Sequence, residues 1–200
     1  MSYRYALVPY IRAPEKYPNV VLFYDEYVSI IKDAFPKGKV HLLILPRNEE
    51  TSKQKSQEAF KDEKTRKMLE AYVHQAIELT QKAFDKEWRR IDGDDEKKMK
   101  ILVCCHSVPS LNNLHIHVLT TDMCGRNMKN KKHYNSFTTD FAIRFDEFPL
   151  KEDDFRLQDK GKCESLLKQD LVYNGANYKS SFKKMQAKIH EDFDKIYKHI

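Results

Sequence analysis

The sequence is poor in glycine and cysteine, with five and four residues respectively among 200. So few glycines, and no repeat or low-complexity segment, exclude collagen-like and glycine-rich chains and leave a globular protein. The cysteines show no C-x-x-C spacing, so neither a disulfide framework nor a cysteine-based zinc site is indicated, as in a reducing compartment. No stretch approaches the roughly 18 to 20 apolar residues of a membrane span, so we expect a soluble intracellular chain without membrane contact.

Charge is moderately one-sided. The formal net charge of +6 is a modest excess that favours polyanionic partners without proving any. A hydrophobic content of 40% is enough for a core, and 200 residues suit one domain plus an appendage. We expect a monomer in which residues 1–150 form the main domain and residues 151–200 a C-terminal segment, with a charged linker at 150–161.

Hydrophobic periodicity predicts an α+β fold. β-Branched and aromatic runs at 20–24, 27–32 and 39–45 predict strands of an antiparallel meander. From Glu63 to Trp88 apolar residues recur at helical spacing, which predicts a long amphipathic helix packed on the sheet. A further strand is expected at 99–105 and a basic amphipathic helix at 180–200.

One stretch carries the chemistry, His106-Ser-Val-Pro-Ser-Leu-Asn-Asn-Leu-His-Ile-His-Val-Leu119. Alternate side chains of a strand share a face, so His115 and His117 stand side by side with Asn113, opposite the apolar residues. Imidazole titrates near pH 6.5 and serves as nucleophile, general acid or base, or metal ligand. The pair therefore indicates a site, although an isolated His-x-His more often only hydrogen-bonds on an exposed sheet face.

A basic segment follows this strand, and no acidic residue lies between Met123 and Thr139. A charged run is usually a solvated face, but basic side chains interleaved with amides, hydroxyls and aromatics favour contacts to phosphates and bases. We expect this block to bind phosphates. The family resemblance described next implies that these phosphates belong to DNA, and that one tyrosine of the aromatic N-terminal segment could stack on a terminal base pair. The residues are Lys129, Lys131, Lys132 and His133, with Tyr10.

Four sequence blocks in this order resemble the aprataxins, DNA 5′-adenylate hydrolases of the histidine-triad superfamily, and the fungal members in particular. The blocks are residues 31–37 ahead of 40–46, 106–110, 114–119 and 129–137. They cover most of residues 20–140, and a weaker match runs to the C-terminus. The resemblance implies the histidine-triad fold, an antiparallel sheet with a long helix packed on it.

The resemblance also implies roles for the matching residues. His115 corresponds to the nucleophile, whose Nε2 would attack the adenylate phosphorus and leave an adenylated histidine for water to hydrolyse. His41 would donate a proton to the leaving group, and Asp33 would accept hydrogen bonds from the ribose hydroxyls. The remaining catalytic positions are His106, Ser110 and His117, and the remaining substrate-binding positions are Ala34, Phe35, Lys37, Leu111, Asn112 and Asn113.

Asn113 departs from the family, whose first triad position is a histidine. An amide can hydrogen-bond but cannot carry a proton or a charge, so we expect Asn113 to orient and His115 to do the chemistry. Metal ligation by His115 and His117 is the alternative use of the pair, but no third ligand is identified by spacing. Because the leaving group is a pyrophosphate of modest basicity, no metal cofactor is required for catalysis.

The C-terminal segment resembles a zinc finger that has lost its ligands. Alignment by apolar positions places Tyr173 and Ala176 where the zinc finger of aprataxins has its two cysteine ligands. It places Lys188 and Asp192 where the helix of that finger carries the other two ligands. Three of the four cannot serve zinc well. We therefore expect a degenerate finger that folds without zinc through apolar packing.

The resemblance therefore implies a DNA-repair hydrolase of the nucleus, and also of the cytoplasm, that removes AMP from nicked or broken DNA with a 5′-adenylate left by abortive ligation. Two alternatives stay open at this point. One is a nucleic-acid-binding module without catalysis, and the other is a general nucleoside phosphoramidate or dinucleotide hydrolase.

Overall fold

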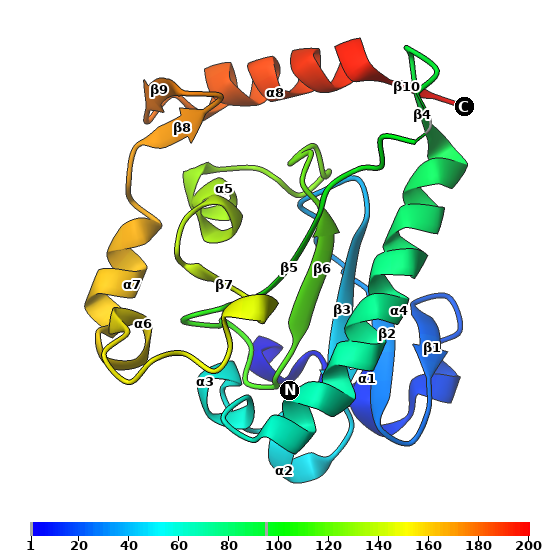
Figure 1. Cartoon of the computed structure of the whole chain (residues 1–200), viewed down its shortest axis with the longest axis vertical. Helices are drawn as coiled ribbons and strands as arrows, with labels where there is room; N and C mark the ends of the chain where they lie inside the picture. Colours follow the sequence, from blue (N-terminus) through cyan, green and yellow to red (C-terminus); the bar gives the residue numbers. More distant parts are fainter. Residues whose placement is uncertain (1, 95) are drawn as a thin grey trace.

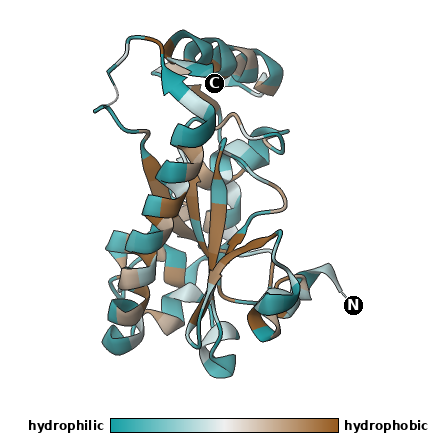
Figure 2. Cartoon of the chain, turned by 90° about the vertical axis from the view of Figure 1, so that its right-hand side faces the viewer, coloured by the Kyte–Doolittle hydropathy of each residue, from teal (hydrophilic) through white to brown (hydrophobic). Residues whose placement is uncertain are grey.

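The computed structural model describes residues 2–94 and 96–200, and its centre is an antiparallel sheet of six strands (Figure 1). The strand order is β1-β2-β3-β6-β5-β7, and each neighbouring pair is antiparallel. The central strands are almost entirely buried, which their hydrophobic colour in Figure 2 reflects. The strands are β1 (Val21–Tyr24), β2 (Val28–Lys32), β3 (His41–Pro46), β5 (Ile101–His106), β6 (Ile116–Thr120) and β7 (Ala142–Arg144).

One face of the sheet is covered by the long helix α4 (Glu63–Glu87). The helix begins at the N-cap Asp62, whose carboxylate accepts the backbone N–H of Thr65 at 2.9 Å. Its buried stripe, which includes Leu69 and Val73, packs against the β6 residues Ile116 and Val118. In this stretch of β6 the intervening side chains point to the opposite face of the sheet, where the histidines lie.

Two separate elements cover the opposite face and leave the histidines between them. Helix α1 (Val8–Arg12), flanked by the 3-10 turns η1 (Tyr3–Tyr5) and η2 (Pro14–Lys16), packs on β2 and β3 through Ile11. Helix α5 (Lys131–Thr138) packs over the other half of the sheet through Phe137. The short helices α2 (Glu49–Ser52) and α3 (Ser56–Ala59) connect β3 to α4.

The C-terminal fifty residues extend the same core. Strands β8 (Leu171–Tyr173) and β9 (Ala176–Lys179) form a hairpin around Asn174 and Gly175, both with positive φ, and α8 (Phe182–Ile196) follows. The buried stripe of α8 packs with Phe84 of α4 and Leu119 of β6. The remaining elements are β4 (Trp88–Arg90), which pairs with the terminal strand β10 (Tyr197–His199), and η3 (Phe145–Glu147), α6 (Phe155–Gln158) and α7 (Lys160–Leu166).

The α+β architecture, the meander and the long helix are confirmed. The linker prediction for 150–161 is wrong, because α6 and the start of α7 occupy it, with Asp154 accepting the backbone N–H of Arg156 at the start of α6. The prediction that the C-terminal helix runs to residue 200 is also wrong, since the chain leaves α8 to pair with β4. In the described part of the chain, no helix combines the length and apolarity needed to cross a membrane.

Phe193 of α8 tests how firmly the C-terminal segment is packed. Its buried ring contacts Phe84, Trp88 and Tyr197 with centroid separations of 4.9 to 6.3 Å. We expect Phe193→Ala to lower the free energy of unfolding by about 3 to 5 kcal/mol in chemical denaturation. Lys198→Ala, at an exposed neighbouring position, should change it by less than about 0.5 kcal/mol. Equal, small effects for both variants would show that α8 is not part of the core.

Candidate active site

Four histidines from three adjacent strands form one buried cluster on the face opposite α4. His41 begins β3 and His106 ends β5. His115 lies just before β6, and His117 lies on it. The ring centroids of His115 and His117 are 4.8 Å apart, those of His41 and His117 5.1 Å, and those of His106 and His117 4.5 Å. The sequence prediction that His115 and His117 share one face is confirmed, and we call the four histidines the histidine cluster.

A main-chain contact fixes the protonation of His115. Its Nδ1 lies 2.7 Å from the backbone carbonyl oxygen of Asn113. A carbonyl oxygen only accepts hydrogen bonds, so Nδ1 carries the proton and Nε2 keeps its lone pair. Because the backbone of Asn113 does this work, the replacement of the family's histidine by an amide does not disturb the tautomer. His115 also lines a small pocket of about 30 Å³ together with Pro109 and Asn112.

The other tautomers follow from one backbone donor. The N–H of Lys37 donates to Nδ1 of His41 at 3.2 Å, so the His41 proton sits on Nε2. That nitrogen is 3.0 Å from Nδ1 of His117 and 3.4 Å from Oδ2 of Asp33, and it donates to them. His117 consequently carries its own proton on Nε2, which is buried and has no hydrogen-bond partner within residues 2–94 and 96–200. The His117 N–H is therefore a preorganised donor.

Aromatic packing closes the cluster from the α5 side. The ring of Phe137 contacts His41, His106 and His117 with centroid separations of 5.5, 4.7 and 5.2 Å. Nε2 of His106 is, like that of His117, buried without a hydrogen-bond partner in the described part of the chain. Of these two nitrogens, Nε2 of His117 carries a proton and is suited to donate to a phosphate oxygen.

Burial keeps all four imidazoles neutral. It lowers the pKa of His41 to about 4 despite the nearby Asp33 carboxylate. Burial, and then the neighbouring His115 and His41, lower the pKa of His106 to about 3. The pKa of His115 is lowered and that of His117 well lowered, again chiefly by burial. At neutral pH His115 is therefore a neutral base with an available lone pair.

The loop after β2 brings the expected nucleoside-binding residues to the cluster. Asp33 lies beside His41, and its Oδ1 accepts the backbone N–H of Phe35 at 2.7 Å. Ala34 and Phe35 are exposed, with Phe35 64% accessible. Lys37 is half-buried, and burial lowers the pKa of its ammonium. A carboxylate, an exposed ring and a cation thus line the approach to His41.

The loop before β6 is held by contacts that the sequence did not reveal. The Asn113 amide donates to Oγ of Ser52 at 2.9 Å, and the backbone N–H of Asn112 donates to the carbonyl of Arg4 at 2.9 Å. Gln57 donates to the carbonyl of Ser107 at 2.9 Å. These partners come from α2, α3 and the N-terminal turn, so no local spacing marks them. Ser110 and Asn112 are exposed on this loop, and Leu111 is half-buried.

Most of the basic block lies in the first turn of helix α5. Asn130 caps α5 by accepting the backbone N–H of His133 at 3.0 Å, and Nδ1 of His133 accepts the N–H of Lys129 at 3.2 Å. Lys129 and Lys132 are exposed, whereas the Lys131 ammonium lies 3.4 Å from the Lys179 carbonyl and 3.9 Å from Asp170. Lys131 therefore also ties α5 to the C-terminal hairpin.

The aromatic N-terminal segment is divided between packing and exposure. Tyr10 is half-buried and packs edge-to-face against Tyr17 at 4.9 Å, beside Leu111. Tyr3 and Tyr5 are 67% and 46% exposed. Tyr10 thus contributes to the core, and the two other rings face solvent.

Within the described residues, one group of side chains could together hold a metal ion, because its donor atoms lie within 4.8 Å of one another. The group consists of Asp33, His41 and His117. The hydrogen bonds argue against that use. The Lys37 N–H directed at Nδ1 of His41 requires the proton on Nε2, the atom that would have to bind the ion. The set therefore fits a chain of hydrogen bonds better than a metal.

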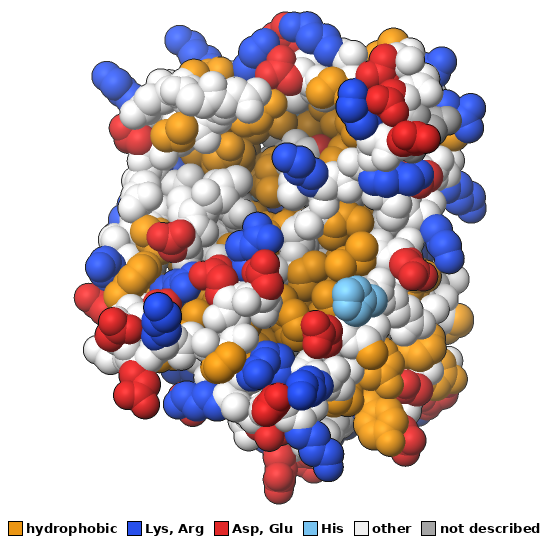
Figure 3. All heavy atoms as spheres, viewed as in Figure 1, with side chains coloured by type: hydrophobic (Ala, Val, Ile, Leu, Met, Phe, Trp, Pro, Cys, Tyr) orange, Lys and Arg blue, Asp and Glu red, His pale blue; other side chains and the backbone are white. Residues whose placement is uncertain are grey.

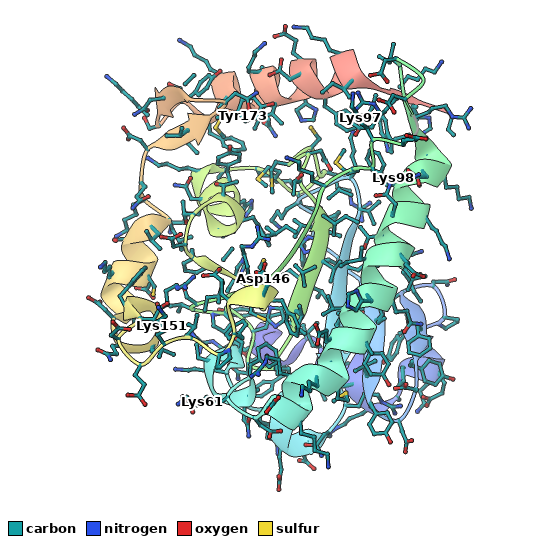
Figure 4. All side chains as sticks on the ribbon, viewed as in Figure 1. Lys61, Lys97, Lys98, Asp146, Lys151 and Tyr173 are labelled. Carbon is teal, nitrogen blue, oxygen red and sulfur yellow. The ribbon has the colours of Figure 1, made fainter. Side chains whose placement is uncertain are left out.

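The C-terminal residues at the positions of the zinc ligands do not fit zinc. Ala176 has no donor atom, and the Lys188 ammonium forms an ion pair with Asp192 at 2.8 Å. Tyr173 hydrogen-bonds to the same carboxylate. Burial is the larger cause, and the Asp192 carboxylate the next, of the raised pKa of this phenol. The Tyr173 side chain extends from β8 toward α5 in Figure 4. The Asp192 carboxylate is thus shared between a lysine of its own helix and the phenol of the hairpin, and only the phenol joins the hairpin to α8.

Comparison with known proteins agrees with this geometry. The family model described as scavenger mRNA decapping enzyme C-term binding matches residues 9–133. An aprataxin-like protein of Saccharomyces cerevisiae is 36% identical over 97% of both chains, and one of Schizosaccharomyces pombe is 32% identical over 96% of this chain and 82% of its own. A crystal structure of the aprataxin orthologue Hnt3 in complex with DNA superposes with a TM-score of 0.78, at 29% identity and 96% coverage of both chains.

Neutral histidines on neighbouring antiparallel strands, one of them fixed with a free Nε2, define a histidine-triad site. Because the similarity to the yeast relative spans nearly the full length of both chains, this chain belongs to the aprataxin-like branch of that class.

The neutral histidines should make stability depend on acid. An unfolded histidine takes up its proton near pH 6.5, but folded His41 does so only at about 4 and His106 at about 3. Between those values the unfolded chain binds more protons, so the free energy of unfolding falls as pH drops below about 6.5, by up to about 1.4 kcal/mol per pH unit for each histidine. Denaturant unfolding at pH 7, 6 and 5 measures this slope.

His106→Phe removes one of these groups while keeping an aromatic ring among Phe137 and Phe141. We expect a shallower dependence of unfolding free energy on pH than in the unaltered protein. An unchanged slope would mean that folded His106 titrates like an unfolded histidine.

We propose that the C-terminal segment folds without zinc. Protein purified without chelator should then contain much less than one equivalent of zinc by elemental analysis, and EDTA should leave its melting temperature unchanged. Asp192→Asn should lower the melting temperature, since it removes the charge that pairs with Lys188. One equivalent of zinc, lost together with the C-terminal fold on chelation, would contradict the proposal.

Proposed function

We propose that this protein is a DNA-repair hydrolase that removes AMP from 5′-adenylated DNA ends through a covalent AMP–histidine intermediate. The observation that carries the proposal is the 2.7 Å contact between Nδ1 of His115 and the Asn113 carbonyl, which leaves Nε2 as a lone-pair nucleophile in a pocket. Its aprataxin-like relatives, and the DNA bound to the similar Hnt3, support DNA as the substrate.

The proposed reaction has two displacements at one phosphorus. Nε2 of His115 attacks the adenylate phosphorus, and the bond from that phosphorus to the bridging oxygen of the DNA 5′-phosphate breaks. The electron pair leaves with the DNA, which retains its 5′-phosphate. Water then attacks the same phosphorus, the P–N bond breaks, and AMP and neutral His115 are released.

We propose that His117 stabilises the leaving group by a hydrogen bond. Its Nε2–H has no partner in the described structure and can be donated to the departing oxygen, which leaves as a phosphate of modest basicity and needs no proton. His41 is 4% exposed and donates to Nδ1 of His117, so it holds that N–H in place. Both imidazoles are neutral and keep their protons, so His41 acts here as a positioning residue and not as the acid expected from sequence. Lys37 can stabilise charge on the phosphate oxygens.

Two other functions are weaker candidates. A binding module without catalysis would have no need of the ordered tautomers that run from Lys37 to His117. A hydrolase of small dinucleotides would have no use for the exposed Lys129 and Lys132, which lie just before α5 and in its first turn. We further propose that the protein acts in the nucleus, as a monomer and without a metal cofactor.

His115→Ala should lower the rate of AMP release from an adenylated nick by about 10³-fold or more while leaving DNA affinity and stability nearly unchanged. Asn113→Ala should cost much less, because its carbonyl remains in place. Single-turnover kinetics measure both variants, and acid-quenched protein analysed by mass spectrometry should carry AMP on His115. An adduct on any other residue, or equal losses for the two variants, would contradict the assignment.

A further inference from the structure

A basic groove of about 1490 Å³ adjoins the active site but contains none of the four clustered histidines. Its walls come from the N-terminal turn and α1, from α2 and α3, from the loop before β6, and from α6. It carries seven cationic and three acidic side chains. They are Arg4, Arg12, Arg47, Lys53, Lys55, Arg156 and Lys160, with Glu26, Glu49 and Glu58.

Four of these cations are already engaged. Arg156 pairs with Glu147 and Asp154, Lys53 with Glu49, and Lys160 with Glu164, while Arg47 donates to the carbonyls of Ile11 and Asp25. These bonds hold the groove walls together.

Three exposed cations have no such partner. Within residues 2–94 and 96–200, Arg4, Arg12 and Lys55 form no ion pair. They come from three different elements that line one groove. Unpaired cations gathered in this way favour a ligand with several negative charges.

The groove and the basic block lie at opposite ends of the histidine cluster. Lys37, at the His41 end, accepts the backbone N–H of Gly125 through its carbonyl, which joins it to the segment that leads into α5. At the His115 end, Asn112 and Asn113 line both the groove and the small pocket at His115. Figure 1 shows the same order, with α5 near the upper ends of the strands and α1 near the lower ends.

We propose that this groove binds the phosphate backbone of the DNA upstream of a nick, the strand that ends in the 3′-hydroxyl. The inference rests on the proposed function. A duplex held at Lys129 and Lys132 brings its 5′ end to His115, and DNA that continues past the break meets the groove beyond His115. The groove is larger than the roughly 300 to 1000 Å³ of small-molecule pockets, which favours a polymer over a mononucleotide.

The test compares two DNAs with the same 5′-phosphate end and no adenylate, so that binding is measured without chemistry. One is a nicked duplex, and the other is the same end without the upstream duplex. We expect tighter binding of the nicked duplex, by at least about tenfold at low salt, and a steeper dependence of log Kd on log salt. The combined variant Arg4→Ala, Arg12→Ala, Lys55→Ala should bind the two DNAs alike, with a salt slope lower by up to about one unit per lost contact.

Two matched variants sharpen this test. The first, Lys64→Ala, Lys82→Ala, Lys86→Ala, removes the same number of exposed positive charges as the groove variant. These lysines lie on α4, on the other face of the sheet, where Figure 3 shows acidic and basic side chains interspersed. This variant should behave like the unaltered protein. Lys129→Ala, Lys132→Ala should weaken binding of both DNAs equally.

The proposal is overturned if the groove variant loses affinity equally for both DNAs, or for neither, or if the unaltered protein does not distinguish them. Release of AMP from an adenylated nick is measured in parallel. Its absence would overturn the proposed function, whereas loss of the nick preference alone would overturn only the assignment of the groove.

Discussion

The site depends on a hydrogen-bond order imposed by two main-chain groups. The Lys37 N–H fixes the proton of His41 on Nε2, and this contact sets His117 in turn, while the Asn113 carbonyl fixes His115. Neither group changes with the side chain at its position. The backbone therefore fixes one nucleophilic lone pair and one N–H hydrogen-bond donor on neighbouring rings, without requiring a charged imidazole. The tautomer of His115 consequently does not depend on the side chain at position 113.

The hydrogen bonds of the histidine cluster are effective because the cluster is buried. The cluster lies between α1 and α5, and Phe137 excludes water from three of its rings. The same desolvation that lowers the histidine pKa values strengthens each remaining hydrogen bond. It also leaves the Nε2–H of His117 unsatisfied within the described structure, a cost that a phosphate group would remove on binding. Stability and readiness for substrate are therefore opposed at this atom.

Periodicity predicted the sheet, the long helix and the shared face of His115 and His117, because these depend on local spacing. It could not predict which distant groups hold the active-site loop. Ser52 contacts Asn113 across 61 positions of the chain, and the carbonyl of Arg4 contacts Asn112 from the far N-terminus. The helix end at 200 was wrong for the same reason, because β10 pairs with β4, more than a hundred residues away. The linker over 150–161 was wrong for a local reason, because Asp154 caps the start of α6.

The central claim is the protonation pattern of the histidine cluster, and nitrogen-15 NMR of the imidazole rings at pH 7 reads it directly. The account predicts four neutral rings, with the proton on Nδ1 of His115 and on Nε2 of His41 and His117. Assignment of each ring would come from spectra of single histidine variants. A protonated, cationic His115, or a proton on Nδ1 of His41, would contradict the account, because the nucleophilic lone pair or the hydrogen-bond chain that orients the His117 N–H would then be missing.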